Sequence, residues 1–287
     1  MVTLEDYESR VKDIAWCPGC GNFPILESLK QALVELNLEP WQVAMVSGIG
    51  QSSKLPHYLR VNEYNELHGR LLPAATGLSL ANHELVVIGV GGDGDGYGEG
   101  GNHWINAIRR NPNMMYMVTN NQIYGLTKGQ ASPTTDYGMK TKDEPVGIKI
   151  PPMNPLAMAI ALDCSFVARS FAGDLDFTKD ILKRAITHKG FAFVDILQPC
   201  VTWNKLNTYQ WYRERVYKLG DDYDPTDKLT AFQKSQEWGE KIPIGVLYLF
   251  KRPVLKDDYV PLQERTLVDL QKTHNPSQFK DLLKKFF

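Results

Sequence analysis

The chain has 287 residues, of which 43% are hydrophobic and 23% charged, and its 32 lysine and arginine residues nearly balance its 33 aspartate and glutamate residues. This composition excludes a disordered or fibrous chain, and the charge balance gives no support for a role on nucleic acid or a membrane surface. No stretch reaches the roughly 18 uncharged apolar residues of a membrane span, and the first residues are acidic where a signal peptide is apolar. We therefore expect a cytoplasmic protein with a large core.

Hydrophobic periodicity alternates between strand and helix along most of the chain. In chain order it predicts a helix after Asn22, a strand 43–46, a helix 71–81, a strand 85–90, a helix 102–110, a strand 114–119, a helix 156–162, a strand 165–168, a helix 177–188 and a strand 191–197. Such alternation is typical of a three-layer α/β/α fold with a doubly wound, mostly parallel sheet. The segments 91–101 and 132–155 are predicted to be loops, the first rich in glycine.

After residue 205 the sequence changes character. We expect residues 1–205 to form one domain and 206–287 to be a C-terminal extension that packs on it and faces partner subunits. Within this extension, an amphipathic helix 225–238 and a strand 244–250 precede a peripheral tail that begins at Lys251.

The densest chemical signal is the sequence Gly91-Gly-Asp-Gly-Asp-Gly-Tyr-Gly-Glu-Gly-Gly101, which lies between a strand and a helix. Such a loop brings backbone N–H groups and a helix N-terminus to an anion, usually a phosphate. Asp93 and Asp95 would repel a bare pyrophosphate, and a divalent cation removes this conflict. Asn121 follows Asp93 by 28 residues, at the end of the next strand. The pattern favours a metal-bridged diphosphate over a nicotinamide dinucleotide, for which the expected acidic residue is missing.

This spacing resembles the thiamine diphosphate motif, and six ordered motifs together resemble the β subunit of the 2-oxoacid:ferredoxin oxidoreductases. They are Trp16-Cys-Pro-Gly-Cys-Gly21, Ser47-Gly-Ile-Gly50, Leu67-His-Gly-Arg70, the Gly-Asp-Gly-Asp loop, Asn121-Gln-Ile-Tyr-Gly-Leu-Thr-Lys-Gly-Gln130 and Ser132-Pro-Thr-Thr135. The resemblance covers roughly residues 10–250. It implies oxidative decarboxylation of a 2-oxoacid to acyl-CoA and CO2, with electrons passed through iron–sulfur clusters to ferredoxin.

The resemblance also implies which residues form the site. Asp93, Asn121 and the carbonyl of Ile123 would bind Mg²⁺. The other cofactor-binding positions would be Gly48, Ile49, Gly50, His68, Gly92, Gly94, Asp95, Gly125, Leu126 and Thr127. Lys54, His68 and Arg70 are the expected catalytic residues, because the Lys54 ammonium can meet a substrate carboxylate and His68 can orient cofactor or substrate.

Four cysteines are too few for a disulfide framework, and a C-x-x-C pair indicates a metal, a cluster or a redox dithiol. By the resemblance, Cys17, Cys20 and Cys200 bind a [4Fe–4S] cluster, but Gln51 stands where the family has its remaining cysteine. Three interpretations stay open. Gln51, water or another residue completes a three-cysteine cluster; Cys164, otherwise expected to be a buried core thiol, completes it; or the cluster is absent or oxygen-labile.

The resemblance further implies partners. An α subunit would supply the glutamate that faces the aminopyrimidine, and a ferredoxin-like subunit or ferredoxin would take the electrons, with coenzyme A as acyl acceptor. The single chain is therefore expected to be inactive. Two alternatives remain, a non-oxidative thiamine-dependent decarboxylase subunit and a non-catalytic scaffold subunit. The substrate stays open between pyruvate, a branched-chain 2-oxoacid and 2-oxoglutarate.

Overall fold

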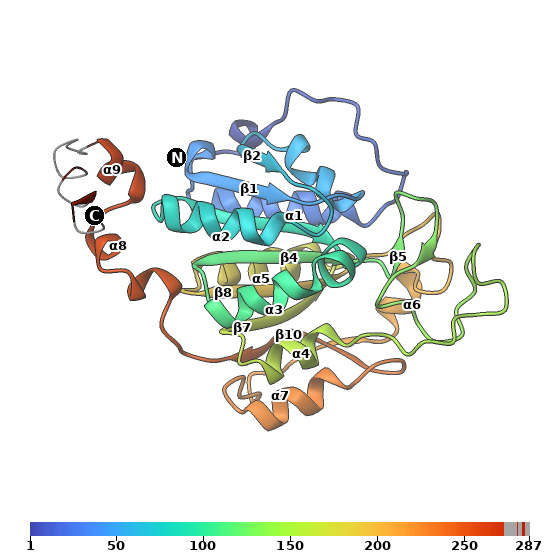
Figure 1. The fold of residues 1–287 in the computed structure, drawn as a ribbon. Helices are drawn as coiled ribbons and strands as arrows, with labels where there is room; N and C mark the ends of the chain where they lie inside the picture. The colour runs from blue at the N-terminus through green and yellow to red at the C-terminus, as the bar shows by residue number, and fades with distance from the viewer. Residues whose placement is uncertain (273–279, 281–282, 285–287) are drawn as a thin grey trace.

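Among the residues that the computed structural model describes, 1–272, 280, 283 and 284, eight strands form one twisted sheet (Figure 1). Its order is β2-β1-β3-β4-β8-β7-β10-β9, and every neighbouring pair is parallel except β7 and β10. The strands are β1 (Val43–Ser47), β2 (Asn62–Asn65), β3 (Val86–Gly92), β4 (Met114–Asn120), β7 (Phe166–Phe171), β8 (Phe191–Leu197), β9 (Val216–Lys218) and β10 (Ile242–Leu249). A separate small hairpin pairs β5 (Ile123–Tyr124) with β6 (Gln130–Ala131).

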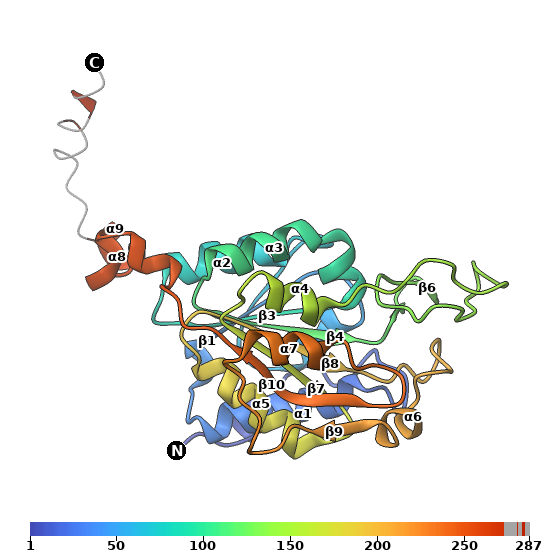
Figure 2. The ribbon, with the colours of Figure 1, turned by 90° about the horizontal axis from the view of Figure 1, so that it is seen from below.

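Helices cover both faces of the sheet (Figure 2). One face packs against α1 and α5, and the other against α2, α3, α4 and α7. Their bounds are α1 (Asn22–Glu35), α2 (Leu71–Ala81), α3 (Gly101–Arg110), α4 (Pro155–Ala161), α5 (Leu175–Thr187) and α7 (Lys228–Ser235), with shorter helices α6 (Tyr209–Arg213), α8 (Pro261–Glu264) and α9 (Leu267–Lys272). Every residue of β1, β4, β7 and β8 is buried, as expected for parallel strands covered on both sides. This confirms the predicted fold class.

The strand order determines where a ligand can bind. From β1 the chain moves outward to β2, and then crosses back to add β3 on the other side of β1. Open α/β sheets bind ligands at the carboxyl ends of their strands where the winding reverses in this way. The carboxyl ends of β1 and β3 are Ser47 and Gly92, and β4 ends beside them at Asn120.

Several elements differ from the prediction. The expected glycine loop is mostly a π-helical turn, Gly94–Glu99, that leads directly into α3. The edge strand β2 was not predicted because its sequence, Asn-Glu-Tyr-Asn, is polar and fully exposed. Beyond residue 205, β9 and β10 join the main sheet, and α7 is shorter than the predicted helix 225–238. Of the expected tail, residues 273–279, 281–282 and 285–287 lie outside the described residues.

Membrane insertion finds no support in the helices. Of those the structure describes, none is both long enough and apolar enough to span a bilayer.

Candidate functional site

A cavity of about 110 Å³ opens at the carboxyl ends of β3 and β4, beside the loop that follows β1. It brings together most of the positions singled out in the sequence, namely Ile49, Gly50, His68, Gly92, Asp93, Gly94, Asp95, Asn121, Ile123, Gly125, Leu126 and Thr127. Gln51, Ser52 and Tyr124 line it as well. Gly48, Lys54 and Arg70 are not part of its lining: Lys54 is half-buried in a 3-10 helix, and Arg70 is exposed.

Asp93 directly follows β3 and is almost fully buried, at 1% exposure. The Ser132 hydroxyl donates to its Oδ2 atom at 2.5 Å, and the Thr134 hydroxyl donates to the same oxygen at 2.9 Å. Burial raises the pKa of Asp93 to about 6, although both hydroxyl hydrogen bonds act to lower it. The carboxylate is therefore fixed through one oxygen, and neither hydroxyl contacts Oδ1.

Asn121 and Ile123 approach Asp93 through a tight reversal of the chain after β4. Gln122 has a φ of 58°, in the left-handed region, and the Asn121 Oδ1 atom accepts a hydrogen bond from the Ile123 N–H at 3.0 Å. A carboxylate, a side-chain amide oxygen and a backbone carbonyl are the hard ligands that Mg²⁺ prefers. No three His, Cys, Asp or Glu side chains of the described residues are arranged around one metal ion, and this set needs only one of them.

Asp95 has a different role from Asp93, because its partners belong to the walls of the cavity. Its Oδ1 atom accepts hydrogen bonds from the backbone N–H groups of Ile49 at 2.9 Å and Gly69 at 2.8 Å, and lies 2.7 Å from His68 Nδ1. The other oxygen, Oδ2, is buried without a partner, and burial raises the pKa of the carboxyl. On its far side His68 contacts the Glu99 carboxylate at 3.2 Å. Asp95 thus joins the loop after β1 to the segment before α2.

The three cysteines of the predicted cluster belong to two segments that lie against each other. The Gly21 N–H donates to the Pro199 carbonyl at 3.2 Å, and Gln198 Nε2 contacts the Cys20 sulfur at 3.3 Å. Burial raises the pKa of the Cys20 thiol to about 11, and nearby Cys200 and Cys17 raise it further. Cys164 is fully buried elsewhere, in the core, as predicted.

Unsatisfied buried polar atoms concentrate in these segments. Both polar atoms of the Asn22 side chain and Gln198 Oε1 are buried without a hydrogen-bond partner. The same is true of Gln51 Oε1, and the Gln51 carbonyl accepts a hydrogen bond from the Trp16 indole at 2.8 Å, next to Cys17. Native proteins leave few such groups unpaired, so their presence is consistent with a group bound beside the cysteines.

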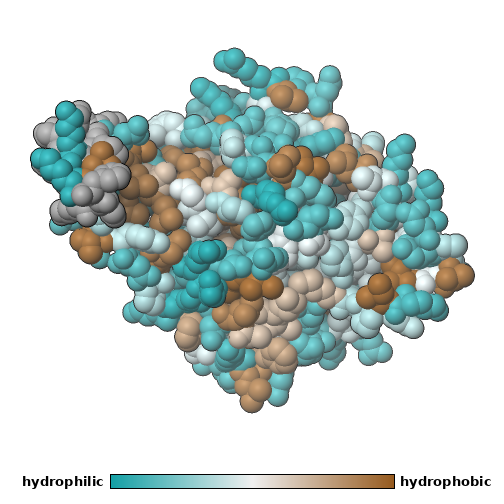
Figure 3. All heavy atoms as spheres, viewed as in Figure 1, coloured by the Kyte–Doolittle hydropathy of each residue, from teal (hydrophilic) through white to brown (hydrophobic). Residues whose placement is uncertain are grey.

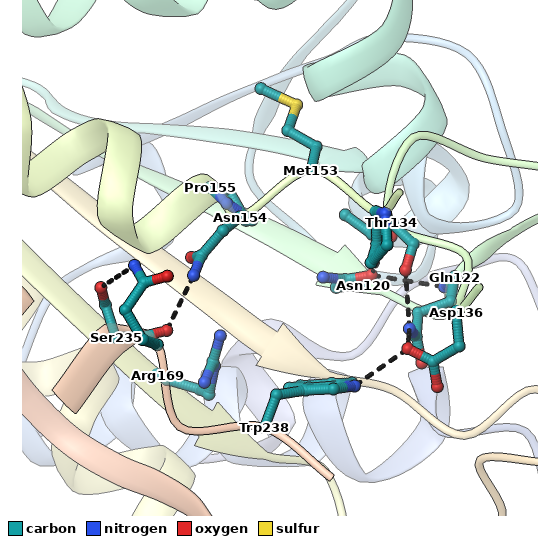
Figure 4. A pocket seen from close by; sticks show the side chains of 12 residues that line it. Asn120, Gln122, Thr134, Asp136, Met153, Asn154, Pro155, Arg169, Ser235 and Trp238 are labelled. Atoms are coloured by element: carbon teal, nitrogen blue, oxygen red, sulfur yellow. Dashed lines mark hydrogen bonds between the residues drawn. The ribbon is translucent and has the colours of Figure 1, made fainter. Parts of the chain in front are cut away.

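A second cavity, of about 210 Å³, lies on the other side of Asn120 (Figure 4). A buried polar network runs along it: the fully buried Asp195 accepts hydrogen bonds from Tyr97 at 2.7 Å and Asn120 at 3.1 Å, and pairs with Arg169 at 3.4 Å. The sequence analysis assigned none of these residues a site role. The available signal was a lone carboxylate in the otherwise apolar strand Phe-Ala-Phe-Val-Asp-Ile-Leu.

Comparison with known proteins identifies the family. Residues 43–196 match the family model of the thiamine pyrophosphate enzyme C-terminal TPP-binding domain, and residues 200–264 match the model for the C terminal of the pyruvate ferredoxin oxidoreductase beta subunit. The chain is 49% identical to 2-oxoacid:ferredoxin oxidoreductase 1 subunit beta of Aeropyrum pernix, over 85% of this chain and 79% of that one. The chain belongs to the 2-oxoacid:ferredoxin oxidoreductase β subunits.

Other similarities agree with this assignment. The 2-oxoacid:ferredoxin oxidoreductase subunit beta of Saccharolobus solfataricus is 44% identical over 92% of this chain and 91% of its own length. The solved structure of 2-oxoglutarate:ferredoxin oxidoreductase from Magnetococcus marinus, with 2-oxoglutarate, coenzyme A and succinyl-CoA bound, matches with a TM-score of 0.88. Its sequence is 39% identical, and the match covers 92% of this chain and 90% of that one. The predicted family, thiamine-binding fold and oxidoreductase function of this β subunit are thereby confirmed.

Proposed function

We propose that this β subunit binds Mg²⁺ and thiamine diphosphate in the 110 Å³ cavity and, with partner subunits, oxidises a 2-oxoacid to acyl-CoA and CO2. The observation that carries the proposal is the meeting of Asp93, Asn121 and Ile123 at one cavity beside the reversal of strand order. Thiamine diphosphate supplies, when bound, a carbon nucleophile and a sink for the electrons released with CO2.

The protein residues bind and orient. In the proposed site, Asp93 Oδ1, the Asn121 amide oxygen and the Ile123 carbonyl hold the metal, which neutralises the diphosphate. Backbone groups of the glycine-rich segments approach the cofactor closely, and their conformation is set by tight packing. At Gly94, for example, a Cβ atom would lie 2.2 Å from the Tyr124 ring. Gly125, Leu126 and Thr127 line the other wall.

The substrate side of the site is proposed to use His68, Lys54 and Arg70. His68 lies at the cavity with one ring nitrogen on Asp95, so its orientation is fixed for hydrogen bonding to cofactor or substrate. Lys54 is a half-buried cation on the helix that begins beside the cavity, and it would meet the substrate carboxylate. Arg70 donates to the Glu99 carbonyl at 3.3 Å and would assist from the rim.

A [4Fe–4S] cluster is proposed at Cys17, Cys20 and Cys200, where thiolates suit iron. Its support is the proximity of the three thiols and the unpaired polar atoms around them. Gln51 Oε1 is buried without a partner among the described residues, so we propose that it faces the fourth iron. A chain with thiols that must stay reduced fits a cytoplasmic location.

Partner subunits are proposed to complete the site. The cavity is smaller than the roughly 300–1,000 Å³ of ordinary ligand pockets. Its surroundings expose apolar side chains, with Leu67 at 74% and Leu126 at 42%, as an interface between subunits would. We assign this surface to an α subunit that supplies the aminopyrimidine glutamate.

The residues from 206 on are proposed to form an extension that also faces partners, among them a ferredoxin-like subunit. Apolar side chains gather beside α8 and α9 (Figure 3), where Leu267 and Val268 are 44% and 40% exposed.

The proposal is tested by anaerobic purification of the chain with its co-expressed partners and an assay of viologen or ferredoxin reduction with pyruvate, 2-oxoglutarate and a branched-chain 2-oxoacid. We expect reduction that requires both a 2-oxoacid and coenzyme A, and none from the single chain. Release of aldehyde and CO2 without reduction of an acceptor would favour the decarboxylase alternative instead. Absence of any turnover in an assembly that has bound thiamine diphosphate would contradict both.

A further inference from the structure

The motif Ser132-Pro-Thr-Thr135 follows the hairpin β5–β6, and its hydroxyl groups all point inward. Ser132, Thr134 and Thr135 are buried, at 8%, 4% and 2% exposure. Thr135 serves the loop itself: it accepts from the Ser132 N–H at 2.8 Å and donates to the Gln122 carbonyl at 2.6 Å. The other two hydroxyls reach across to the end of β3, where both meet Asp93 Oδ2.

We propose that Ser132 and Thr134 are positioning residues for the metal, which hold Asp93 by Oδ2 so that Oδ1 is presented to Mg²⁺. This inference rests on the proposed function, because it deepens the role of the same cavity. Two donors on one carboxylate oxygen restrict rotation of the carboxyl group. They also leave the oxygen that neither contacts as the one available to a cation. Hydrogen bonds to metal-binding carboxylates from outside the coordination sphere commonly control affinity in this way.

The position of Thr134 is itself fixed by the buried network beside the second cavity. Its hydroxyl lies 2.8 Å from Asn120 Oδ1, and Asn120 donates to Asp195 at 3.1 Å (Figure 4). A hydroxyl has one proton for these two acceptors, and a charged carboxylate is the stronger acceptor. The proton therefore goes to Asp93, while Asn120 Oδ1 is served by the Gln122 N–H at 3.3 Å. The network explains why the hydroxyl stays on the Asp93 side without a second donor.

The backbone geometry makes this arrangement specific to the loop. Gln122 Nε2 donates to the Thr134 carbonyl at 2.7 Å and to Asp136 at 3.0 Å, so the reversal that carries Asn121 is tied to the motif that holds Asp93. Two of the proposed metal ligands are thus joined through one loop. A displacement of the motif would change the distance between them.

The test uses the anaerobic assembly and measures the Mg²⁺ concentration at which it retains thiamine diphosphate, after removal of metal with EDTA and back-titration. Thr134→Val keeps the shape and removes the hydroxyl, Thr134→Ser restores a hydroxyl, and Ser132→Ala removes the second donor. We expect Thr134→Val and Ser132→Ala to require roughly 10–100-fold more Mg²⁺, and Thr134→Ser to stay near the wild-type value. At saturating Mg²⁺ the thiamine diphosphate content should recover in every variant.

A matched control separates positioning from loss of a buried hydroxyl. Thr178 is fully buried on α5, and its hydroxyl donates to the Phe171 carbonyl at 3.0 Å, so Thr178→Val should lower the melting temperature without changing the Mg²⁺ requirement. An unchanged Mg²⁺ requirement in both Thr134→Val and Ser132→Ala would overturn the inference. So would failure of Thr134→Ser to rescue. A wild-type assembly that binds no thiamine diphosphate at any Mg²⁺ concentration would instead contradict the proposed function.

Discussion

Gln51 is the residue whose identity bears most on the redox chemistry of this β subunit. A neutral amide oxygen is a much weaker ligand for iron than a thiolate. Its buried, unpaired Oε1 atom lies in a segment that contacts Trp16, next to Cys17. A cluster held by three cysteines and Gln51 would therefore have one weakly bound iron.

This account predicts that Gln51→Cys strengthens the cluster. Iron and sulfide per chain should be near four in the variant after brief exposure to air, because the added thiolate holds the fourth iron. The wild type should lose iron under the same treatment and give the electron paramagnetic resonance signal of a three-iron cluster. Gln51→Ala is the control and should lose iron at least as fast. Equal iron retention in wild type, Gln51→Cys and Gln51→Ala would show that residue 51 does not face the cluster.

At the scale of elements, the turn between β3 and α3 is held by close approach of backbones. Gly69 has a φ of +72°, and a Cβ atom there would lie 2.5 Å from the Glu99 carbonyl carbon. Gly77, in contrast, lies on the exposed side of α2 with nothing within 4 Å of a built Cβ atom. The two glycines therefore have opposite consequences for stability.

We predict that Gly69→Ala lowers the free energy of unfolding by at least about 1–2 kcal/mol, because left-handed backbone and a backbone clash combine. Gly77→Ala should raise it by about 0.5–1 kcal/mol, since alanine loses less conformational entropy in a helix. Urea unfolding monitored by circular dichroism measures both. A stability loss in Gly77→Ala, or none in Gly69→Ala, would show that the packing around α2 is not as described.

The sequence predicted the central strands because each is a continuous apolar run, buried on both faces, as in β4 and β8. It missed β2, which is polar and at the edge of the sheet, and it predicted a loop where the π-helical turn lies. Glycine disfavours helix in isolation, but tertiary contacts decide here: a Cβ atom at Gly96 would lie 2.0 Å from the Tyr116 hydroxyl.

At the scale of the whole molecule, spacing along the chain indicated the proposed metal ligands, because Asp93 and Asn121 end successive strands. It could not indicate what holds them. The hydroxyls of Ser132 and Thr134 reach Asp93 from about 40 residues away, and Gln198 contacts Cys20 across 178 residues. Such contacts depend on how the loops cross the carboxyl edge of the sheet, which no local pattern records.

The central claim is that this chain binds thiamine diphosphate through a metal held by Asp93 and Asn121. The most direct measurement is the thiamine diphosphate content of the anaerobically purified assembly, with Mg²⁺ and after EDTA, for wild type and Asp93→Ala. We predict about one equivalent per chain in the wild type with Mg²⁺, loss of the cofactor with EDTA, and little bound by Asp93→Ala under either condition. Circular dichroism of the variant checks that it is folded. A folded wild-type assembly without thiamine diphosphate at saturating Mg²⁺, or full binding by Asp93→Ala, would contradict the account.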